Sequence, residues 1–424
     1  MSAARPGGTV TDGPLTKGPV SNAPVTNGPV ITAWSAVSPY GIGRTAYAEG
    51  LGAGRTTATA TATATPSDPE TAPNPDSLAC LVPDFAVREV LGKAGTRTMD
   101  RSTGLAVTAV RELLQDAEND ERLVPTGTGT ALVLGTTLGS AQGQHDFGRA
   151  SFEGDKPYDV PAKLMPNVLM NCPTAATAIW FGLKGPNATL AGGRPAGLLA
   201  LGYARRLLAA GRAERALVGA VEEYSTVRSW LEHHSRGADD EQAGPLGEGC
   251  AMLLLEPADG VPEGRRALAE ILAIDVRADV RDDLAGTLAE CVEQALEEAG
   301  ARPDEVWAAV GGGLPGAAGR AEQRLLDEVF GTAVTGRVVS HELIGDTSAA
   351  STVFQVAAVL AAAAEDPAAA GRPAVVTSVD RDGMAACAVL RLLPQNGPAG
   401  GGTSRTATSR TATHSDPQSE GHDR

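Results

Sequence analysis

Short apolar segments alternate with longer segments of helical spacing from residue 30 to residue 394, and this alternation limits the possible folds most strongly. Residues 131–136 (ALVLGT) and 216–221 indicate buried strands. Between them, residues 197–210 indicate a helix that begins after Pro195 and ends at Gly211. Strands that alternate with helices in this way predict an α/β protein with a mainly parallel sheet.

The same alternation returns further along the chain, which indicates a duplicated layered fold. Gly300 ends one of the expected helices, as glycine commonly does. The further expected strands are residues 251–255, 266–274, 307–310, 374–378 and 387–392, and the further helices are residues 282–299, 321–330 and 351–364.

Three segments lack the apolar residues that a packed core needs. Residues 1–29 repeat Gly-Pro or Ala-Pro every five residues, and residues 395–424 contain Ser-Arg-Thr-Ala-Thr twice. Such composition does not offset the entropy lost on ordering, so we expect a disordered extension and a disordered tail. Residues 56–77 begin as a Thr-Ala alternation and continue rich in proline, which favours a polar surface loop. The core is then divided into residues 30–260 and 261–394.

Charge and cysteine usage exclude several functions. Lys and Arg number 35 against 51 Asp and Glu, a net charge of −16, which disfavours nucleic acid and anionic membranes as partners. The longest apolar run, residues 353–364, is far shorter than a bilayer requires, and the N-terminus lacks the apolar segment of a signal peptide. Five scattered cysteines without a CxxC pair argue against a zinc ribbon or a disulfide framework. We therefore expect a soluble, cytoplasmic protein.

Three segments in order resemble the β-ketoacyl synthases. They are residues 30–55 with a Ser-Pro-Tyr-Gly turn, residues 164–187 (LMPNVLMNCPTAATAIWFGLKGPN), and residues 247–256 (GEGCAMLLLE). The resemblance spans roughly residues 30–394. It implies the thiolase-like fold, in which two duplicated βαβαβαββ halves form a five-layered α-β-α-β-α core, and it implies a dimer.

The catalytic residues of that family are replaced in this chain. The family uses a cysteine nucleophile at a strand-to-helix turn and two histidines that assist decarboxylation. Counting from both ends of residues 185–201 places Arg194 at the cysteine position. The first histidine position falls on Gly311, and the second falls on Asp346 of His-Glu-Leu-Ile-Gly-Asp, where His341 replaces a lysine. A guanidinium stays protonated and cannot act as a nucleophile, so we expect no intrinsic activity.

Three losses in one recognisable frame resemble the chain-length factors of type II polyketide synthases. The resemblance implies a heterodimer with an active ketosynthase, in a pathway such as antibiotic biosynthesis, and a role in setting polyketide chain length. It also implies contact with an acyl carrier protein whose phosphopantetheine arm holds the growing chain and which docks mainly on the active partner. No metal and no cofactor is expected. Chain-length factors usually carry glutamine at the cysteine position, so Arg194 departs from their pattern.

A buried Arg194 needs an acidic partner, because a desolvated charge is costly. The family fold places the cysteine and second-histidine positions opposite each other, which makes Asp346 the expected partner. Asp380 and Asp382, in the loop that corresponds to the family's Gly-Phe-Gly-Gly, are the reserve partners. The alternative is that Arg194 points to solvent.

The resemblance also implies a chain-length gate after Ala141-Gln142-Gly143. It puts His145, Gly148 and Phe152 on the tunnel side, and their spacing of three and four lies on one helical face. Phe152 is expected to form the floor of the tunnel, with Gly148 leaving room. The alternative is ordinary packing of these residues.

Other functions remain as alternatives. Residues 311–316 match the GxGxxG of dinucleotide-binding turns, although Pro315 interrupts the pattern and Glu342 lies too far along the chain. A ketosynthase-like acyltransferase or decarboxylase with unconventional residues is a second rival, and a scaffold outside polyketide assembly is a third. Cys172 is interpreted as a small buried thiol rather than a displaced nucleophile.

Overall fold

The structure is a computed structural model that describes residues 28–61, 75–118, 124, 126–236, 244–339 and 341–395. The expected N-terminal extension up to residue 27, residues 62–74 of the polar loop, and the tail from residue 396 lie outside the described residues.

The first half follows the expected βαβαβαββ order in its main elements. Its last two strands, β7 and β9, pair antiparallel along their length. The main elements are β1 (Pro29–Ser38), α3 (Arg101–Glu118), β5 (Thr130–Thr136), α5 (Cys172–Phe181), β6 (Asn187–Ala191), α6 (Ala196–Ala209), β7 (Arg215–Glu222) and β9 (Gly249–Pro257). The smaller ones are β2 (Gly41–Ile42), α1 (Arg44–Gly52), β3 (Thr59–Ala60), β4 (Leu78–Cys80), α2 (Val87–Val90), α4 (Ala141–Glu153), η1 (Ala162–Val168), α7 (Thr226–Ser235), β8 (Leu246–Gly247) and η3 (Ala258–Gly260).

The second half repeats this order with one strand fewer in its described residues. No strand is assigned among those residues between β11 and α12, where the counterpart of β6 would stand. Its elements are β10 (Ala269–Ala278), α8 (Leu284–Ala299), η4 (Pro303–Glu305), β11 (Ala308–Val310), α9 (Gly316–Phe330), α10 (Thr332–Thr335), α11 (His341–Ile344), η5 (Ser348–Ala350), α12 (Ser351–Glu365), η6 (Pro367–Ala369), β12 (Pro373–Val379) and β13 (Met384–Leu392).

The main sheet is mixed, so the expectation of a mainly parallel sheet is wrong. Its strand order is β11-β12-β13-β10-β1-β9-β7-β5-β6. Only β11 with β12, β7 with β5, and β5 with β6 pair in parallel along this order. The two halves meet where β1 pairs antiparallel with β10. The closing strand of each half is antiparallel, and β12 reaches β13 through a tight turn that needs no crossover helix.

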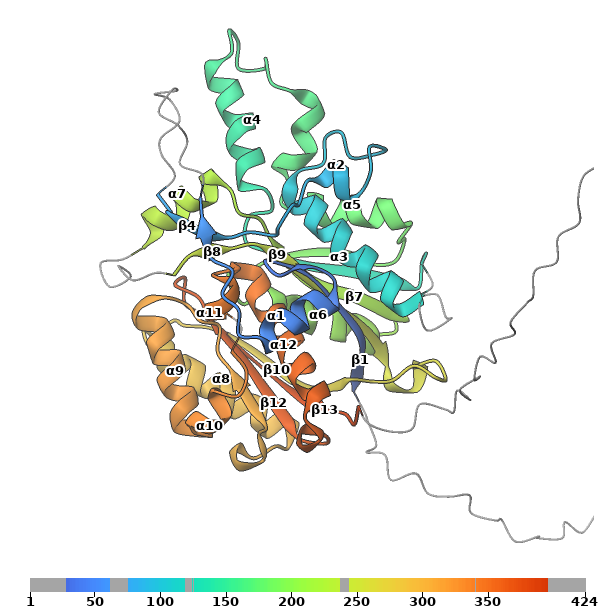
Figure 1. Ribbon diagram of the computed structural model, residues 1–424, viewed down its shortest axis with the longest axis vertical. Helices are drawn as coiled ribbons and strands as arrows, with labels where there is room; N and C mark the ends of the chain where they lie inside the picture. The colour runs from blue at the N-terminus through green and yellow to red at the C-terminus, as the bar shows by residue number, and fades with distance from the viewer. Residues whose placement is uncertain are drawn as a thin grey trace, which may run out of the picture.

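Three clusters of buried apolar side chains hold together the five layers of Figure 1. One cluster lies between α3 and the first-half strands, around Leu105 and Leu113. The central cluster packs α6 against α12, with Leu198 and Phe354 fully buried. The third lies between α8, α9 and the second-half strands, around Leu288. The first-half strands and the second-half strands of the main sheet form the two sheet layers, so the order of layers is helix, sheet, helix, sheet, helix, as expected.

The central helix α12 is apolar because it is covered on both sides. Residues Ser348–Glu365 are long and apolar enough to cross a membrane by composition, and 78% of this stretch is buried inside the protein. Burial within the fold accounts for its apolar character.

The polar loop is not a loop throughout. Thr59–Ala60 forms the short strand β3, which pairs antiparallel with β4, and β4 pairs in parallel with β8. The expectation of an unpaired loop over residues 56–77 is therefore wrong at this point. The Thr-Ala alternation supplies two residues to a small separate sheet, because β4 offers a strand edge for pairing.

Candidate functional site

Arg194 lies at the turn between β6 and α6 and points into the protein. Its side chain is only 4% exposed. The preceding Gly193 adopts a left-handed φ of 59°, and a Cβ at that position would clash with the Asp380 carboxylate. The turn therefore requires glycine so that the Arg194 backbone N–H can donate to Asp380 Oδ2 at 2.8 Å.

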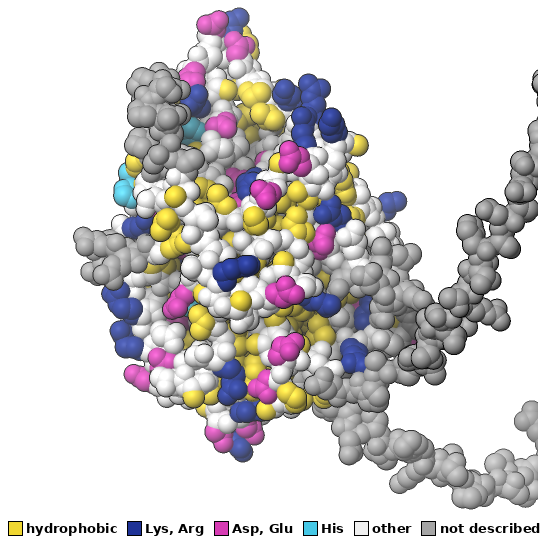
Figure 2. All heavy atoms as spheres, viewed as in Figure 1, with side chains coloured by type: hydrophobic (Ala, Val, Ile, Leu, Met, Phe, Trp, Pro, Cys, Tyr) yellow, Lys and Arg dark blue, Asp and Glu magenta, His cyan; other side chains and the backbone are white. Residues whose placement is uncertain are grey.

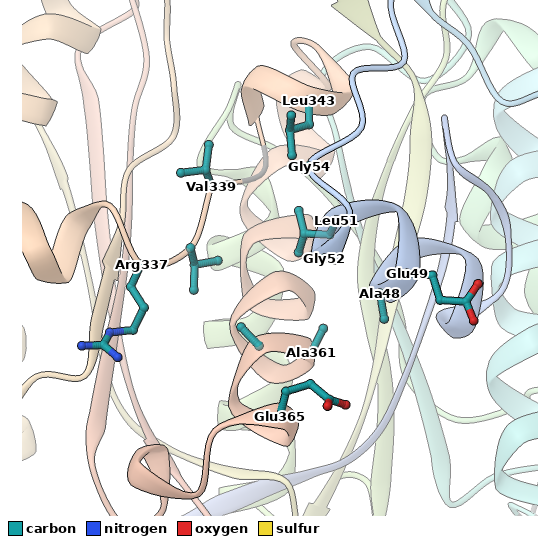
Figure 3. Close-up of a pocket in the computed structure, with 12 residues that line it drawn as sticks. Ala48, Glu49, Leu51, Gly52, Gly54, Arg337, Val339, Leu343, Ala361 and Glu365 are labelled. Atoms are coloured by element: carbon teal, nitrogen blue, oxygen red, sulfur yellow. The ribbon is translucent and has the colours of Figure 1, made fainter.

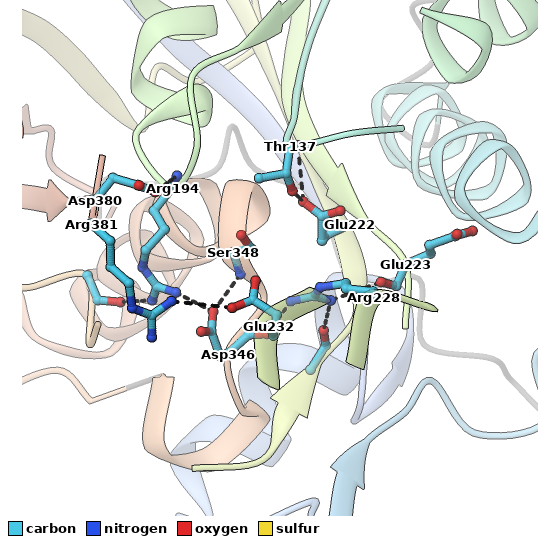
Figure 4. Close-up of polar contacts among 12 residues, drawn as sticks. Thr137, Arg194, Glu222, Glu223, Arg228, Glu232, Asp346, Ser348, Asp380 and Arg381 are labelled. Atoms are coloured by element: carbon cyan, nitrogen blue, oxygen red, sulfur yellow. Dashed lines mark hydrogen bonds and ion pairs between the residues drawn. The ribbon is translucent and has the colours of Figure 1, made fainter. Parts of the chain in front are cut away.

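The Arg194 guanidinium is held by two groups from the second half of the chain (Figure 4). Nη1 donates to Asp346 Oδ1 in an ion pair, and Nη2 donates to the carbonyl of Gly312 at 2.8 Å. Burial alone would raise the pKa of Asp346, but the guanidinium groups of Arg194 and Arg228 outweigh it and hold that pKa at about 2. Asp346 is therefore an ionised partner for Arg194.

The other expected partners occupy different places. Asp380 binds the Arg194 backbone rather than its guanidinium. Asp382 donates its backbone N–H to Asp380 Oδ1 at 3.0 Å, and within the described residues it makes no bond to the Arg194 guanidinium. The structure thus brings Arg194 and Asp346 together, keeps Asp380 at the turn, and leaves Asp382 outside the pair.

Gly311 and Gly312 complete the site after β11. Gly311 accepts a hydrogen bond from Gln355 Nε2, and the Gly312 N–H donates to Glu322 Oε1 at 3.0 Å. Burial raises the pKa of Glu322, and Thr377 Oγ1 also donates to its Oε1, at 2.7 Å. The N–H groups of a dinucleotide-binding turn must face a pyrophosphate, whereas Gly312 uses its own on Glu322. The GxGxxG interpretation therefore has little geometric support.

At the three vestigial positions, which the family resemblance assigns to catalytic residues, Arg194 offers only hydrogen-bond donors, Gly311 has no side chain, and the Asp346 carboxylate is paired with Arg194. Burial lowers the pKa of Arg194, but the charge and hydrogen bond of Asp346 outweigh burial, so the net pKa is raised and the guanidinium stays charged. The ring of His341 lies against Gly313, beside this site, and burial lowers its pKa. The arrangement can hold a buried ion pair, and it lacks the thiolate chemistry of a condensing enzyme.

Sequence reasoning missed three charged residues between the vestigial positions and α4. Arg228 of α7 is 4% exposed and donates to three carbonyls, those of Glu223 at 2.9 Å, Gly247 at 2.7 Å and Asp346 at 2.8 Å. Glu222, at the end of β7, accepts from the Thr137 hydroxyl. The sequence did contain a signal for Glu222 and Glu223, because two adjacent carboxylates directly follow the apolar run of residues 216–221.

Glu223 joins the end of β7 to the start of α4. Its Oε1 accepts from Ser140 Oγ at 3.1 Å and from the Gln142 N–H at 3.3 Å. Ser140 is the N-cap of α4 and accepts from the Gly143 N–H at 3.1 Å. Burial raises the pKa of Glu223 to about 7, with the Asp100 and Glu222 charges adding to the shift.

The expected gate residues share the open face of α4, which projects from the layered core in Figure 1. The His145 side chain is 49% exposed, Phe152 is 92% exposed, and a Cβ at Gly148 would meet nothing within 4 Å among the described atoms. Phe152 is therefore not packed inside this chain. Cys172 is half-buried, and its burial raises the pKa of the thiol, which disfavours the thiolate a nucleophile needs.

A cavity of about 740 Å³ lies elsewhere, between α1, α12 and residues 337–343 (Figure 3). Arg194, Gly311 and Asp346 are not among the residues that line it. Its lining includes Leu51, Val338, Val339, Leu343, Ala361 and Ala362.

Comparison with known proteins agrees with this geometry. Residues 29–260, more than half of the chain, match the N-terminal domain of the β-ketoacyl synthases. The chain belongs to the β-ketoacyl synthase family. The second β-ketoacyl synthase of the actinorhodin polyketide system of Streptomyces coelicolor is 28% identical over 328 residues, which cover 71% of this chain and 77% of that protein. The ketoacyl synthase alpha subunit of the tetracenomycin polyketide synthase of Streptomyces glaucescens is 29% identical over 272 residues, which cover 58% of this chain and 62% of that protein.

Solved structures of the family share the fold. The ishigamide ketosynthase/chain length factor superposes with a TM-score of 0.81 and is 47% identical, over 86% of this chain and 99% of that chain. A β-ketoacyl synthase from Burkholderia phymatum superposes with a TM-score of 0.71 at 22% identity, over 87% of this chain and 100% of that chain, a likeness of fold alone. The thiolase-like ketosynthase fold and the family resemblance are thus confirmed.

Proposed function

We propose that this chain is a non-catalytic chain-length factor of a type II polyketide synthase. One observation carries the proposal: the Arg194–Asp346 ion pair occupies the positions where a condensing enzyme needs a cysteine and a histidine. Support comes from the 47% identity to a structure whose name includes a chain-length factor. The chain then contributes shape, and the ketosynthase partner contributes the Cys-His-His chemistry.

An exposed apolar face supports a partner subunit. Large apolar side chains stay exposed on α4, η1 and α5, and β6 is the last strand in the described sheet. Monomeric proteins seldom expose such patches, and an unpaired strand edge favours pairing with another chain. Figure 2 shows one group of apolar side chains near the top of the molecule, beside several Lys and Arg, and further apolar side chains across the middle of this face. We name the residues of this partner face as Phe152, Met165, Leu169, Met170, Ile179 and Trp180.

The gate residues belong to the same surface, which links dimerisation to chain length. His145, Gly148 and Phe152 lie on the open side of α4 and reach a polyketide chain only if the ketosynthase completes the tunnel wall. A growing chain that meets the Phe152 ring stops, whereas Gly148 leaves space beside it. The acyl carrier protein delivers its phosphopantetheine-bound chain mainly to the ketosynthase, because the reacting thiolate lies there.

Native mass spectrometry of this chain, co-expressed with a cysteine-bearing ketosynthase from the same gene cluster, tests the proposal. The expected result is a 1:1 complex in which an acyl group loads only onto the ketosynthase. A homodimer that ignores the ketosynthase would favour a scaffold outside polyketide assembly. Acyl loading on this chain would instead favour an acyltransferase or decarboxylase with unconventional residues.

A further inference from the structure

We propose that the charged residues at the vestigial positions have a positioning role: they anchor the N-terminal end of α4 and so fix the chain-length gate. This inference rests on the proposed function for its effect on product length. The anchoring itself is a property of this chain alone. We call the four residues Arg194, Asp346, Arg228 and Glu223 the anchor.

Figure 4 shows the anchor from Arg194 to Glu223, and the hydrogen bonds of the Glu223 carboxylate continue it to α4. Arg194 pairs with the Asp346 carboxylate, and the Asp346 carbonyl accepts from Arg228 Nη2 at 2.8 Å. Arg228 Nη1 donates to the carbonyl of Glu223 at 2.9 Å. The Glu223 carboxylate then binds Ser140 Oγ and the Gln142 N–H at the first turn of α4. Arg194, Arg228, Glu223 and Ser140 are buried, so water competes little for their hydrogen bonds.

Arg228 connects the Asp346 loop to the Glu223 loop. It is a buried cation whose hydrogen bonds go to main-chain carbonyls, two of them on the loops that carry Asp346 and Glu223. Its position depends on the negative charge of Asp346, which also lowers the energy of the desolvated guanidinium. Removing Arg194 leaves Asp346 without its direct ion-pair partner and alters the loop to which Arg228 donates.

The base of α4 has few other attachments. α4 projects from the core, and its main neighbours are η1 and α7, the helix that carries Arg228. The loop before α4 is held by Glu222, which binds Thr137, and by Glu223. Glu222 and Glu223, which are adjacent at the end of β7, therefore hold the two ends of this loop. A shift there tilts the helix, and Phe152, near its far end, moves most.

Amide hydrogen exchange on α4 tests the anchoring directly. Arg194→Met removes the ion pair, and Glu223→Ala removes the contacts with Ser140 and Gln142. We expect exchange at the first turn of α4, including the Gly143 N–H, to rise by about tenfold in each variant, because local opening becomes easier. Arg302→Met, at an arginine that is 70% exposed in the second half, is the matched control and should leave α4 unchanged. Unchanged exchange on α4 in Arg194→Met would overturn the anchoring.

A double-mutant cycle on product length tests its consequence. Arg194 and Glu223 are not bonded to each other in the described chain, so independent effects would multiply. If they act through one anchor, Arg194→Met and Glu223→Ala each raise the ratio of products of other lengths to the main product by ~10-fold. The double variant Arg194→Met/Glu223→Ala then also stays near ~10-fold rather than ~100-fold. Glu223→Gln, which keeps an acceptor oxygen, should retain the wild-type ratio. A multiplicative double variant would contradict the shared anchor.

Loss of folding is separated from loss of positioning by a further variant. Arg194→Met/Asp346→Asn removes both charges, so it avoids a buried unpaired carboxylate. If this variant regains wild-type melting while its product distribution stays broad, the pair positions α4. If melting and product distribution both return, the pair is only structural and the inference fails. A wild-type chain that forms no complex with the ketosynthase would refute the proposed function, whereas the exchange measurement would still decide the anchoring.

Discussion

At the scale of single residues, Arg194 and Asp346 form a pair whose members depend on each other. Arg194→Met leaves an ionised carboxylate in a site that excludes water, and breaking a buried pair in this way costs roughly 3–5 kcal/mol. We expect the free energy of unfolding in urea to fall by about that amount, and Arg194→Met/Asp346→Asn to recover most of it. A loss below about 1 kcal/mol in the single variant, typical of an exposed pair, would show that solvent reaches the site.

Buried carboxyl groups also set the pH dependence of stability. The pKa of Glu223 is raised to about 7, so the folded chain keeps a proton that the unfolded chain loses above its ordinary pKa. Stability from this group is present below that ordinary pKa and is lost as the pH rises toward 7, at up to ~1.4 kcal/mol per pH unit. Asp346 acts oppositely, because its pKa is lowered to about 2 and its stabilisation disappears on acidification.

Urea unfolding at several pH values measures these contributions. Wild-type stability is expected to decline between about pH 5 and pH 7, and Glu223→Gln should make that decline shallower. Glu222 and Glu322, whose pKa values burial also raises, supply the remaining slope. An identical slope in the wild type and in Glu223→Gln would show that Glu223 is already ionised throughout this range.

At the scale of elements, α4 is expected to limit the length of the polyketide chain. Phe152→Ala removes a ring that is 92% exposed on this chain, so folding should change little while the main polyketide becomes longer. Gly148→Phe adds a ring to the same face and should shorten the product, because a Cβ there meets no described atom. Mass spectrometry of products from the reconstituted complex measures both. Products of wild-type length from both variants would remove α4 from the tunnel wall.

The sequence predicted elements better than their arrangement. Apolar runs ended by glycine or proline located α6 and α8 closely, because these signals act within one helix. Strand direction depends on partners far along the chain, so the antiparallel pairing of β1 with β9 and β10 was not predictable from local spacing. The proximity of Arg194 and Asp346 was predicted from the resemblance to the β-ketoacyl synthases, whose fold places these two positions opposite each other. Arg228 bonds to main-chain carbonyls, which leave no pattern in side-chain identity.

At the scale of the whole molecule, the distribution of exposed apolar side chains predicts where the ketosynthase binds. Ile179 of α5 is 83% exposed on the partner face, and Val280 is 88% exposed in the second half, just after β10. An arginine introduced at Ile179 would be buried against an apolar surface of the partner, with no acidic group to pair with. Apolar side chains at the centre of an interface commonly contribute about 2 kcal/mol or more to binding, and this contribution would also be lost. Ile179→Arg should therefore weaken the heterodimer by about 30-fold or more.

Val280→Arg is the matched control, since it introduces the same charge at an equally exposed apolar residue outside the partner face. Both variants should melt like the wild type, because neither side chain contributes to a core cluster. Titration of each variant with the ketosynthase, followed by native mass spectrometry, measures the dissociation constants. If Val280→Arg weakens the complex and Ile179→Arg does not, the partner binds the second half, and α4 then lies too far from the shared surface to limit the chain. Selective loss in Ile179→Arg places the gate residues and the partner on one face, as a chain-length factor requires.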